Sequence, residues 1–437
     1  MNEDRTLAIH GGDSVRKHSF PAYKVIGEEE KDVVSEVLDR GVLSKFLGTW
    51  HDDFFGGPEV QALEIEWAEY FGVKHAISVN SATSGLHCAV GAVDVQPGEE
   101  VIVTGLSMSC SATAPLIFNA IPVFADINSD DFCLDPKSIE EKITHRTSAI
   151  IVVNMFGHPH DAEAIASIAR RHDLRVIEDN AQGPGATYRG KYAGTLTDVG
   201  VFSLNYHKHI HCGEGGIVVT DDDDIADRVR LIRNHAEAVV DGMGRTDLSN
   251  LIGFNFRLSE IAAAIARCQL KKLEPLLIQR QNNCHYLNHE LDRIPAIKPV
   301  KVREHCTHAY YVQPFKFNEK EAGVHRDKFL EAVVAELPTI ELRESEGVKI
   351  YYGYKPLYLL PMFQNKIAYG SNGCPFVAPW YDGEVNYQKG ICPTLEQMAE
   401  DELFYHELMH SCMNEEDLDD VIRAFNKVWD NRQALSK

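Results

Sequence analysis

Cysteine pairs of the form C-x-x-C are missing from this sequence of 437 residues, although ten cysteines are scattered along it. Thiols without such spacing are typical of reduced core residues and argue against a disulfide framework. The charged first residues, MNEDR, lack the apolar run of a signal peptide, and no later segment is long and uncharged enough to span a bilayer. We therefore expect a cytoplasmic protein without a membrane partner.

Positive charge is also scarce, since 43 lysines and arginines stand against 65 aspartates and glutamates, which gives a net charge of −22. A nucleic-acid-binding protein usually carries a basic stripe, and the sequence has none, so no nucleic-acid partner is expected. Hydrophobic residues make up 44% of the chain, which is enough to form a sizeable core. The length fits one large domain and one smaller domain.

Short apolar runs alternate with helical patterns between about residues 58 and 220. A helix is predicted over 60–72, where Val60, Leu63 and Trp67 share one face. Strand-like apolar runs follow at 75–80, 100–105, 121–126, 149–156, 174–179, 199–204 and 216–221. This alternation predicts a mainly parallel sheet between two layers of helices, in which ligands bind beyond the carboxyl ends of the strands.

The later part of the chain has a different pattern. Residues 255–295 are helical, with a start at Ser259 and a kink or break at Pro275. We therefore divide the chain into a large domain, 1–275, and a smaller C-terminal domain, 276–437. The stretch 340–395, rich in Gly, Pro and Tyr, is expected to form loops near the surface, and a last amphipathic helix is expected over 414–433.

Three histidines alternate around a lysine in the segment FSLNYHKHIHCGEGG, residues 202–216. If 205–211 formed a strand, His207, His209 and His211 would share one face and could bind zinc. The GEGG turn that follows favours a loop that approaches a ligand, and then the histidines line a pocket. The segment GHPHDAE also lacks the Asp-His ending of metal-dependent hydrolase motifs. A metallohydrolase remains an open alternative.

The lysine of this segment, Lys208, favours another chemistry. A lysine in an enclosed pocket beyond a strand can form a Schiff base with a carbonyl group, most commonly that of pyridoxal phosphate (PLP). That cofactor also needs a carboxylate for its ring nitrogen, a cradle of backbone N–H and hydroxyl groups for its phosphate, and packing on its ring face.

Each requirement has a candidate in the sequence. Asp179 ends an apolar strand-like run and suits the ring nitrogen. Thr83 and Ser84 lie in NSATSG, where a strand-like run gives way to a helical pattern, and Ser203 supplies another hydroxyl five residues before Lys208. The glycines of GEGG allow a tight turn of the backbone beside the cofactor. The order and spacing of these residues are more informative than any one of them.

With these motifs the sequence resembles the DegT/StrS family of PLP-dependent sugar aminotransferases. The resemblance covers about Gly27 to Trp429 and is carried by GGPEVQALEIEWAEYFGVKHAISVNSATSGLHCAV, by VIEDNAQGPGATYRGKYAGTLTDVGVFSLNYHKHIHCGEGGIVVTDD, by LIRNHA and by GFNFRLSEIAAAIARCQL. It implies fold type I of the PLP enzymes. In that fold a large domain holds a mainly parallel, seven-stranded sheet between helices, and a smaller C-terminal domain is α+β.

The resemblance also implies a role for each matching position. Lys208 would be the Schiff-base lysine, Asp179 would pair with the pyridinium nitrogen, and Gln182 would lie near the ring hydroxyl. Asn255 would reach the phosphate of the neighbouring subunit's cofactor, which predicts a homodimer with its active site at the subunit interface. The residues expected to hold the phosphate of the same subunit are Thr83, Ser84 and Ser203.

Three positions depart from the family pattern or leave two roles open. Met108 stands where the family often stacks an aromatic residue on the PLP ring, and its sulfur can pack on the ring instead. His207 replaces a small hydroxyl residue before the lysine and is expected to contact substrate. Arg257 either binds substrate or forms an ion pair at the dimer interface. A branch of the family that dehydrates keto sugars has histidine in place of the lysine, so Lys208 favours transamination.

The implied reaction transfers an amino group from L-glutamate or glutamine to a keto sugar in two steps. Lys208 would move a proton between the substrate carbon and the cofactor, and Asp179 would keep the ring cationic. The amino sugar would serve a cell-surface polysaccharide, lipopolysaccharide or antibiotic pathway. The sequence leaves the keto sugar open, and it also leaves open a dehydratase of the same family and a PLP-binding relative without turnover. Specificity is expected to reside in the aromatic region 340–390.

Overall fold

A computed structural model describes residues 6–436. All seven strand-like runs form strands of one sheet, with the order β1-β9-β8-β5-β4-β2-β3. Only β9 runs antiparallel to its two neighbours, so the other six strands end at one edge of the sheet. The strands are β1 (His75–Val79), β2 (Glu100–Thr104), β3 (Ile121–Ala125), β4 (Thr147–Val153), β5 (Arg175–Asp179), β8 (Val199–Ser203) and β9 (Gly216–Thr220).

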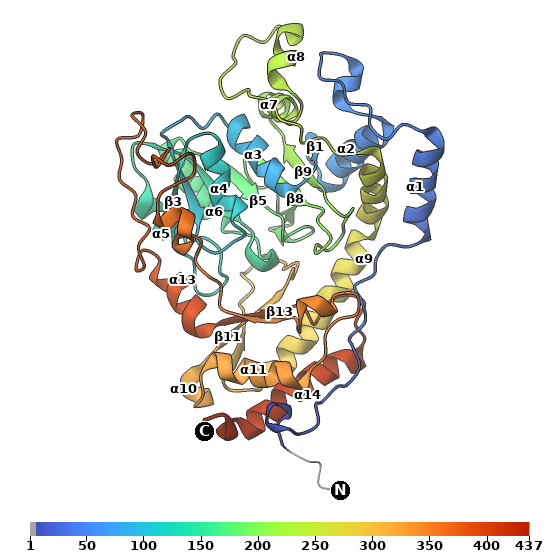
Figure 1. The fold of residues 1–437 in the computed structure, drawn as a ribbon, viewed down its shortest axis with the longest axis vertical. Coiled ribbons are helices and arrows are strands. Elements are labelled where there is room, and N and C mark those ends of the chain that lie inside the picture. The colour runs from blue at the N-terminus through green and yellow to red at the C-terminus, as the bar shows by residue number, and fades with distance from the viewer. Residues whose placement is uncertain (1–5, 437) are drawn as a thin grey trace.

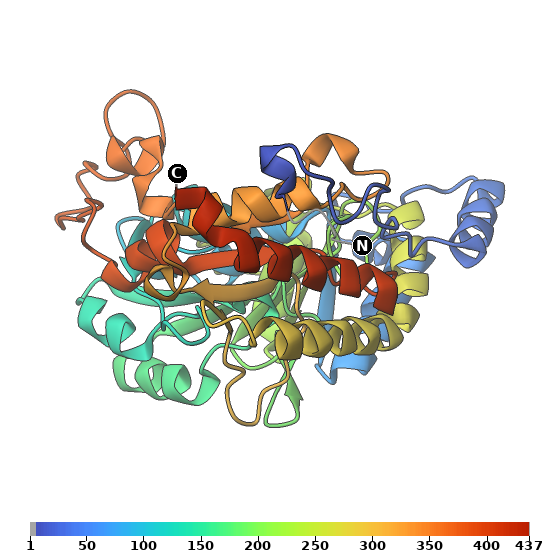
Figure 2. The same ribbon diagram turned by 90° about the horizontal axis from the view of Figure 1, so that it is seen from below.

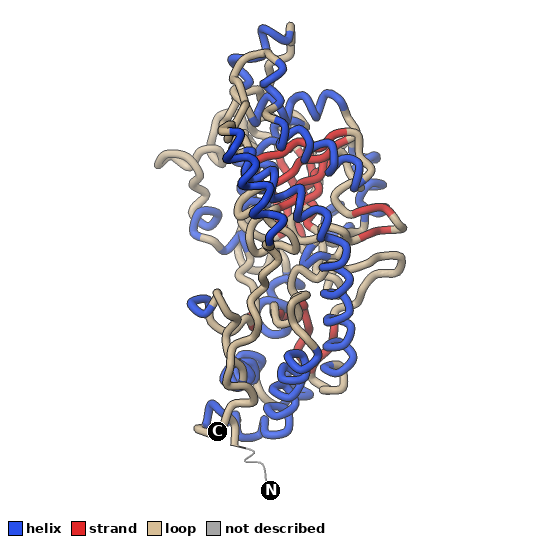
Figure 3. Tube along the Cα trace, turned by 90° about the vertical axis from the view of Figure 1, so that its right-hand side faces the viewer, coloured by secondary structure: helices blue, strands red, loops and turns tan. Residues whose placement is uncertain are grey.

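Helices cover both faces of this sheet, as Figure 3 shows for the strands enclosed between helices. One face is covered by α3 (Ala82–Ala92), α4 (Cys110–Ile117) and α7 (Asp223–Arg233), and the other by α2 (Pro58–Phe71), α5 (Pro136–Lys142) and α6 (Ala162–His172). Helix α3 lies close to the strands because Gly85 has no side chain, and a Cβ there would stand 2.7 Å from Val201 Cγ1. The predicted layers are confirmed.

Helix α9 (Glu260–Leu291) connects the large upper part to the smaller lower part of the molecule (Figure 1). Ser259 caps it through a 3.3 Å bond from Ala262 N–H, as predicted. The predicted break at Pro275 is absent, because one helix of 32 residues runs through this position. Packing at both ends holds the helix together, on α2 and α1 (Glu28–Arg40) above and on α14 (Glu415–Asn431) below. The proposed domain boundary therefore falls inside a helix.

The lower part is built on a second, antiparallel sheet with the order β10-β11-β13-β12. Its strands are β10 (Ile297–Pro299), β11 (Gln313–Phe317), β12 (Ile350–Tyr352) and β13 (Leu403–His406). Helices α11 (Arg326–Glu336) and α14 share its hydrophobic core, and α14 crosses the lower face of the molecule in Figure 2. The predicted α+β architecture of this part is confirmed.

The first described residues belong to the lower part in space. Arg16 pairs with Asp417 and Asp420 at 2.7 and 3.0 Å, and Phe20 is buried in the core beneath the second sheet. The chain then rises to α1 beside α9 (Figure 1). The N-terminal arm of the predicted large domain thus ties the two parts of the molecule together.

The segment 340–395 was expected to form loops near the surface, and for part of its aromatic residues this expectation is wrong, although Tyr352, Tyr369 and Trp380 are exposed. Tyr358, Phe363 and Tyr387 are buried and surround Phe124 of β3 with ring centroids 5.2 to 5.5 Å apart. The Tyr387 hydroxyl donates to the carbonyl oxygen of Pro122 at 2.6 Å. Tyrosine permits this because its ring fills a core while its hydroxyl finds a partner. The segment closes the β3 edge of the main sheet.

The remaining short elements lie in connections. They are α8 (Ala236–Met243), α10 (Glu319–Ala322), α12 (Pro361–Gln364), α13 (Pro393–Gln397), β6 (Thr187–Tyr188) and β7 (Lys191–Tyr192). In the described part of the chain, no helix combines the length and the apolar character that crossing a membrane requires.

Candidate active site

The carboxyl ends of β1, β5 and β8 place the predicted residues at one edge of the sheet. Asp179 is the last residue of β5, Ser203 is the last residue of β8, and Lys208 lies in the turn that follows β8. Gly213, with φ of 87°, lets this loop return, and its carbonyl oxygen accepts a 2.9 Å bond from Tyr206 N–H. The expected turn at GEGG is therefore present.

The Lys208 amine has an unusual environment for a cation. It lies 3.9 Å from the centre of the Tyr311 ring, and within residues 6–436 it makes no hydrogen bond or ion pair. Burial lowers the pKa of Lys208 to about 8, although the Asp179 carboxylate acts in the opposite direction. The amine is therefore partly neutral near neutral pH, as a group that attacks a carbonyl must be.

The Asp179 carboxylate is buried beside this amine. It accepts hydrogen bonds from Ser111 Oγ at 2.7 Å and from Ala181 N–H at 3.1 Å, and it forms no ion pair in the described part of the chain. Burial raises the pKa of Asp179, and the hydrogen bond from Ser111 opposes that rise. A cationic ring N–H opposite the carboxylate would compensate for its desolvation, so the site fits a protonated pyridine ring. The sequence analysis missed Ser111.

The start of α3 forms a cradle for an anion next to this pair. Ser81 caps the helix and accepts from Ser84 N–H at 3.1 Å, and the Ser84 hydroxyl donates to Asn80. The Thr83 side chain is hydrogen-bonded to the Cys110 thiol. Gly216 leaves the cradle open, since a Cβ there would stand 2.6 Å from the carbonyl carbon of Ser81. Backbone N–H groups at a helix start suit a phosphate.

Gln182 and His207 lie on the side of the site that faces the lower part of the molecule. The Gln182 Oε1 atom accepts from Phe156 N–H at 2.7 Å, which fixes a buried side chain. The His207 ring packs at a tilt against the Tyr206 ring with centroids 3.6 Å apart, and its Nδ1 lies 3.0 Å from Arg343 Nη2. Both residues line the cavity in which the predicted substrate would react.

The other predicted residues lie on the outer surface of the chain. Met108 is 65% exposed, so its packing on a ring remains a prediction. Asn255 is exposed, and its Oδ1 accepts from Arg257 Nε at 2.8 Å. The intervening Phe256 accepts from Asn80 N–H at 2.8 Å through its carbonyl oxygen, which places this loop beside the start of α3.

The metal hypothesis needed a strand over 205–211, and the structure has a turn there. The three histidines also make different contacts. His207 meets Arg343, His209 Nε2 lies 2.7 Å from the Ala309 carbonyl oxygen, and His211 lines a neighbouring cavity. Among residues 6–436 there is no cluster of histidine, cysteine and acidic side chains that could hold a metal ion.

Two cavities of about 330 and 250 Å³ share a wall that includes His207, the residue before Lys208, and Tyr311, the ring against which the Lys208 amine packs. Sequence reasoning missed most of this wall, because its residues are far apart in the chain and belong to no motif. The shared wall consists of His207, Tyr311, Arg343, Glu346 and Glu407, and the smaller cavity adds Tyr351, Tyr354 and Tyr405. Tyrosine faces and charged hydrogen-bonding groups suit a ligand with many hydroxyl groups.

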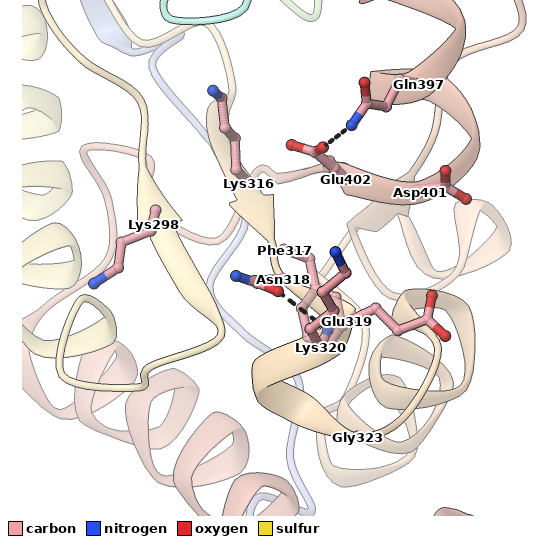
Figure 4. A pocket seen from close by; sticks show the side chains of 10 residues that line it. All are labelled: Lys298, Lys316, Phe317, Asn318, Glu319, Lys320, Gly323, Gln397, Asp401 and Glu402. Carbon is pink, nitrogen blue, oxygen red and sulfur yellow. Dashed lines mark hydrogen bonds between the residues drawn. The ribbon is translucent and has the colours of Figure 1, made fainter.

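A larger hollow lies elsewhere on the described surface. It measures about 850 Å³ and is lined by Lys298, Lys316, Lys320, Asp401 and Glu402, among others (Figure 4). Gln397 and Glu402 are hydrogen-bonded to each other at its side, and none of the residues predicted for PLP lies there. The predicted residues Gln182 and His207 instead line the smaller cavities.

Comparison with known proteins gives a match to the DegT/DnrJ/EryC1/StrS aminotransferase family over residues 26–403. An L-glutamine:2-deoxy-scyllo-inosose aminotransferase of Streptomyces lividus is 35% identical over 70% of this chain and 74% of the relative. A GDP-perosamine synthase of Caulobacter vibrioides is 39% identical over 61% of this chain and 68% of that protein. An aminotransferase structure from Psychrobacter cryohalolentis superimposes with a TM-score of 0.79 at 25% identity, covering 95% of this chain and 99% of that one.

Proposed function

Because this chain belongs to the DegT/DnrJ/EryC1/StrS aminotransferase family and is therefore a PLP-dependent aminotransferase, we propose that it aminates a keto sugar or a keto-cyclitol. The amino donor in this proposal is L-glutamine or L-glutamate. The single observation that carries it is the buried amine of Lys208, in the turn after β8, which interacts electrostatically with the buried carboxylate of Asp179 at the end of the adjacent strand β5.

The residues of this chain fit the cofactor as follows. The start of α3 with Thr83 and Ser84, together with Ser203, would hold the phosphate, and Gln182 would contact the ring. Asp179 would keep the ring nitrogen protonated. When bound, PLP supplies an aldehyde that takes up the amino group and a ring that accepts electrons from the substrate carbon.

The Lys208 Nζ atom is the group that moves the proton. Its pKa of about 8 lets it exist in both protonation states near neutral pH. Tyr311 packs against the amine and keeps water from it, which preserves this lowered value. Asp179 is buried, so its charge acts with little screening.

A polyhydroxylated ring is the acceptor that these cavities favour. Tyr351, Tyr354 and Tyr405 present ring faces and hydroxyls, and Glu407 presents a carboxylate that accepts hydrogen bonds. The names of the relatives, with inosose and perosamine, support the same class of acceptor. The product would be an amino sugar or aminocyclitol for a surface polysaccharide, a lipopolysaccharide or an antibiotic.

A homodimer remains part of the proposal. Met108 and Ile252 are 65% and 71% exposed, and Trp50 is 44% exposed, although such large apolar groups favour burial. Asn255, between Ile252 and the start of α9, would then reach the partner's cofactor. We also keep the cytoplasm as the proposed location, which the ten free thiols support. The division near residue 275 likewise stays a proposal.

The test combines a labelled donor with a panel of keto sugars and keto-cyclitols. We expect transfer of the α-amino nitrogen of L-glutamine or L-glutamate to one class of acceptor, seen by mass spectrometry. Loss of water from a keto sugar without gain of nitrogen would indicate the dehydratase alternative instead. No reaction of any amino donor with the bound cofactor would contradict the proposal.

Lys208→Ala tests the site directly. Borohydride reduction should link PLP covalently to the wild-type protein, and the mass of the digested peptide should place it on Lys208. Lys208→Ala should show neither the link nor amino transfer. The exposed Lys191 offers a matched control, and Lys191→Ala should retain both. A link that persists in Lys208→Ala would place the reactive amine elsewhere.

A further inference from the structure

The proposed function sets a recognition problem that the site must solve. One amine, that of Lys208, has to react in turn with an amino acid, which carries a carboxylate, and with a keto ring, which carries hydroxyl groups. A carboxylate is held best by a guanidinium group, and a hydroxyl is held well by a carboxylate. The cavities beside Lys208 should therefore hold groups of both kinds. The inference below rests on the proposed function.

The lining of the two cavities contains two guanidinium groups, those of Arg280 and Arg343. Arg280 is 4% exposed, and its Nη1 donates to the carbonyl oxygens of Tyr310 and Tyr311 at 3.0 and 3.1 Å. These backbone contacts hold the lower part together and cannot be exchanged without disturbing it. Arg280 is therefore a structural group.

Arg343 differs because the hydrogen bonds of its guanidinium group end on side chains. Its Nη1 donates to Glu407 Oε2 at 2.6 Å, its Nη2 donates to Glu346 Oε2 at 2.8 Å, and the same nitrogen lies 3.0 Å from His207 Nδ1. His207 is the residue immediately before Lys208 in the chain, so this contact brings the guanidinium group to the Lys208 segment. Arg343 is the cation of the cavity wall that can change partners.

The two carboxylates that hold Arg343 are not equivalent. Glu346 is also paired with Lys349, and its ion pair with Arg343 lowers the pKa of Glu346 to about 2. Within residues 6–436 the Glu407 carboxylate accepts only one further hydrogen bond, from the Tyr351 hydroxyl at 3.2 Å. The side chains of Arg343 and Glu407 are 16% and 21% exposed, and both line the cavities, so a ligand in the cavities can reach the pair.

We propose that Arg343 binds the carboxylate of the amino donor and that Glu407 is its exchangeable partner. The incoming carboxylate replaces Glu407 on Nη1, while Glu346 keeps the guanidinium in place. When the keto acid product leaves, the Arg343–Glu407 ion pair forms again, and Glu407 balances the charge of Arg343. Glu407 then accepts hydrogen bonds from the hydroxyl groups of the keto ring. One ion pair thus serves both substrates of the site.

The experiment measures the two half-reactions separately, using the absorbance change of the bound cofactor. In Arg343→Gln we expect the KM for the amino donor to rise by about 10- to 100-fold, because the charge-assisted contact of the donor carboxylate with Nη1 is lost. The KM for the keto acceptor, measured with the aminated cofactor, should change by less than about threefold. Arg343→Lys should restore part of the donor affinity.

A donor without the carboxylate provides the sharper readout. In the wild-type protein the donor KM should be much higher for the α-carboxamide of L-glutamine than for L-glutamine itself. In Arg343→Gln the ratio of these two KM values should be at least about tenfold smaller. In Glu407→Gln the donor KM should not rise, because the carboxylate that competes with the donor for Arg343 is removed. The acceptor KM should rise, because the carboxylate that accepts hydrogen bonds from the keto ring is lost. The matched control is Arg189→Gln, since Arg189 lies outside the cavities, is 57% exposed and pairs with Glu163.

The outcomes separate this inference from the proposed function. If Arg343→Gln raises both KM values equally, or leaves the discrimination against the carboxamide unchanged, then Arg343 does not bind the donor carboxylate. The aminotransferase reaction itself would still stand in that case. If none of the amino acids tested converts the cofactor of the wild-type protein, the proposed function itself fails, whatever the role of Arg343.

Discussion

The amine of Lys208 lies 3.9 Å from the centre of the Tyr311 ring. This contact joins the two parts of the molecule at Lys208 Nζ. Lys208 follows β8 of the main sheet, and Tyr311 precedes β11 of the second sheet. The ring attracts the ammonium form but also keeps water from the amine. Burial dominates, since the pKa of Lys208 falls from 10.5 to about 8.

Recombination of the cofactor-free protein with PLP should therefore depend on pH. Only the neutral amine attacks an aldehyde, so the rate should rise as the pH increases towards about 8 and become constant above that value. Tyr311→Ala would let water reach Nζ and raise the pKa of Lys208, and the rate at pH 8 should fall by about tenfold or more. Stopped-flow absorbance across a pH series measures both effects.

Tyr311→Phe is the control for that experiment. Phenylalanine keeps the ring and its packing, so the midpoint of the rate profile should stay where it is in the wild-type protein. A midpoint that moves equally in both variants would mean that the Tyr311 hydroxyl, and not the exclusion of water, sets the pKa of Lys208.

Asp179→Asn should separate cofactor binding from turnover. Asparagine retains the size of the side chain and can accept the hydrogen bond from Ser111, so PLP should still bind. The negative charge opposite the ring nitrogen is lost, and kcat should fall by about 100-fold or more. Ser111→Ala removes only the hydrogen bond and should lower kcat far less. Equal losses in the two variants would assign the effect to the position of the side chain.

Gly216→Ala should weaken PLP binding through the backbone of α3. The new methyl group would stand 2.6 to 2.8 Å from backbone atoms of Ser81 and Ala82, which cannot move aside as a flexible side chain can. Displacing the helix start disturbs the phosphate cradle, and equilibrium dialysis should show at least a tenfold rise in Kd. Gly190→Ala, where a Cβ meets nothing within 4 Å, should leave the Kd unchanged even though its φ of 79° costs about 1 kcal/mol of stability.

Buried histidines should make the fold sensitive to acid. Burial lowers the pKa of His160, His406 and His410 to about 3 each, so these rings are neutral in the folded protein. Below the unfolded value near 6.5 the unfolded chain binds protons that the folded chain cannot, and stability falls as pH decreases. At pH 5 each such histidine costs about 2 kcal/mol.

His406→Gln isolates one of these groups. His406 Nδ1 accepts from Leu408 N–H at 3.2 Å, and Nε2 is buried without a partner among the described residues. Urea unfolding at pH 7 and pH 5 should show a smaller loss of stability in the variant than in the wild-type protein. The exposed His18 serves as the control, since His18→Gln should leave the pH dependence unchanged. A wild-type stability that is constant from pH 7 to pH 5 would contradict the argument.

The sequence by itself determined the sheet, its helical layers and the family. Apolar runs bounded by glycine and polar residues predict buried strands because both faces of such a strand lose water, and all seven were found. Local chemistry also predicted Ser259 as a helix cap and the turn after Lys208. Such features depend on neighbours in the chain, which the sequence displays directly.

Only the tertiary structure decided the rest of the site. Tyr311 meets Lys208 across the two parts of the molecule, Arg343 and Glu407 share a cavity wall with Tyr311, and no spacing in the sequence relates these residues. The same limit explains why the buried aromatic residues of 340–395 were expected at the surface and why Pro275 was expected to interrupt α9. Contacts between distant segments set burial, pKa and pairing, because these depend on the whole surroundings of a side chain and not on its neighbours along the chain.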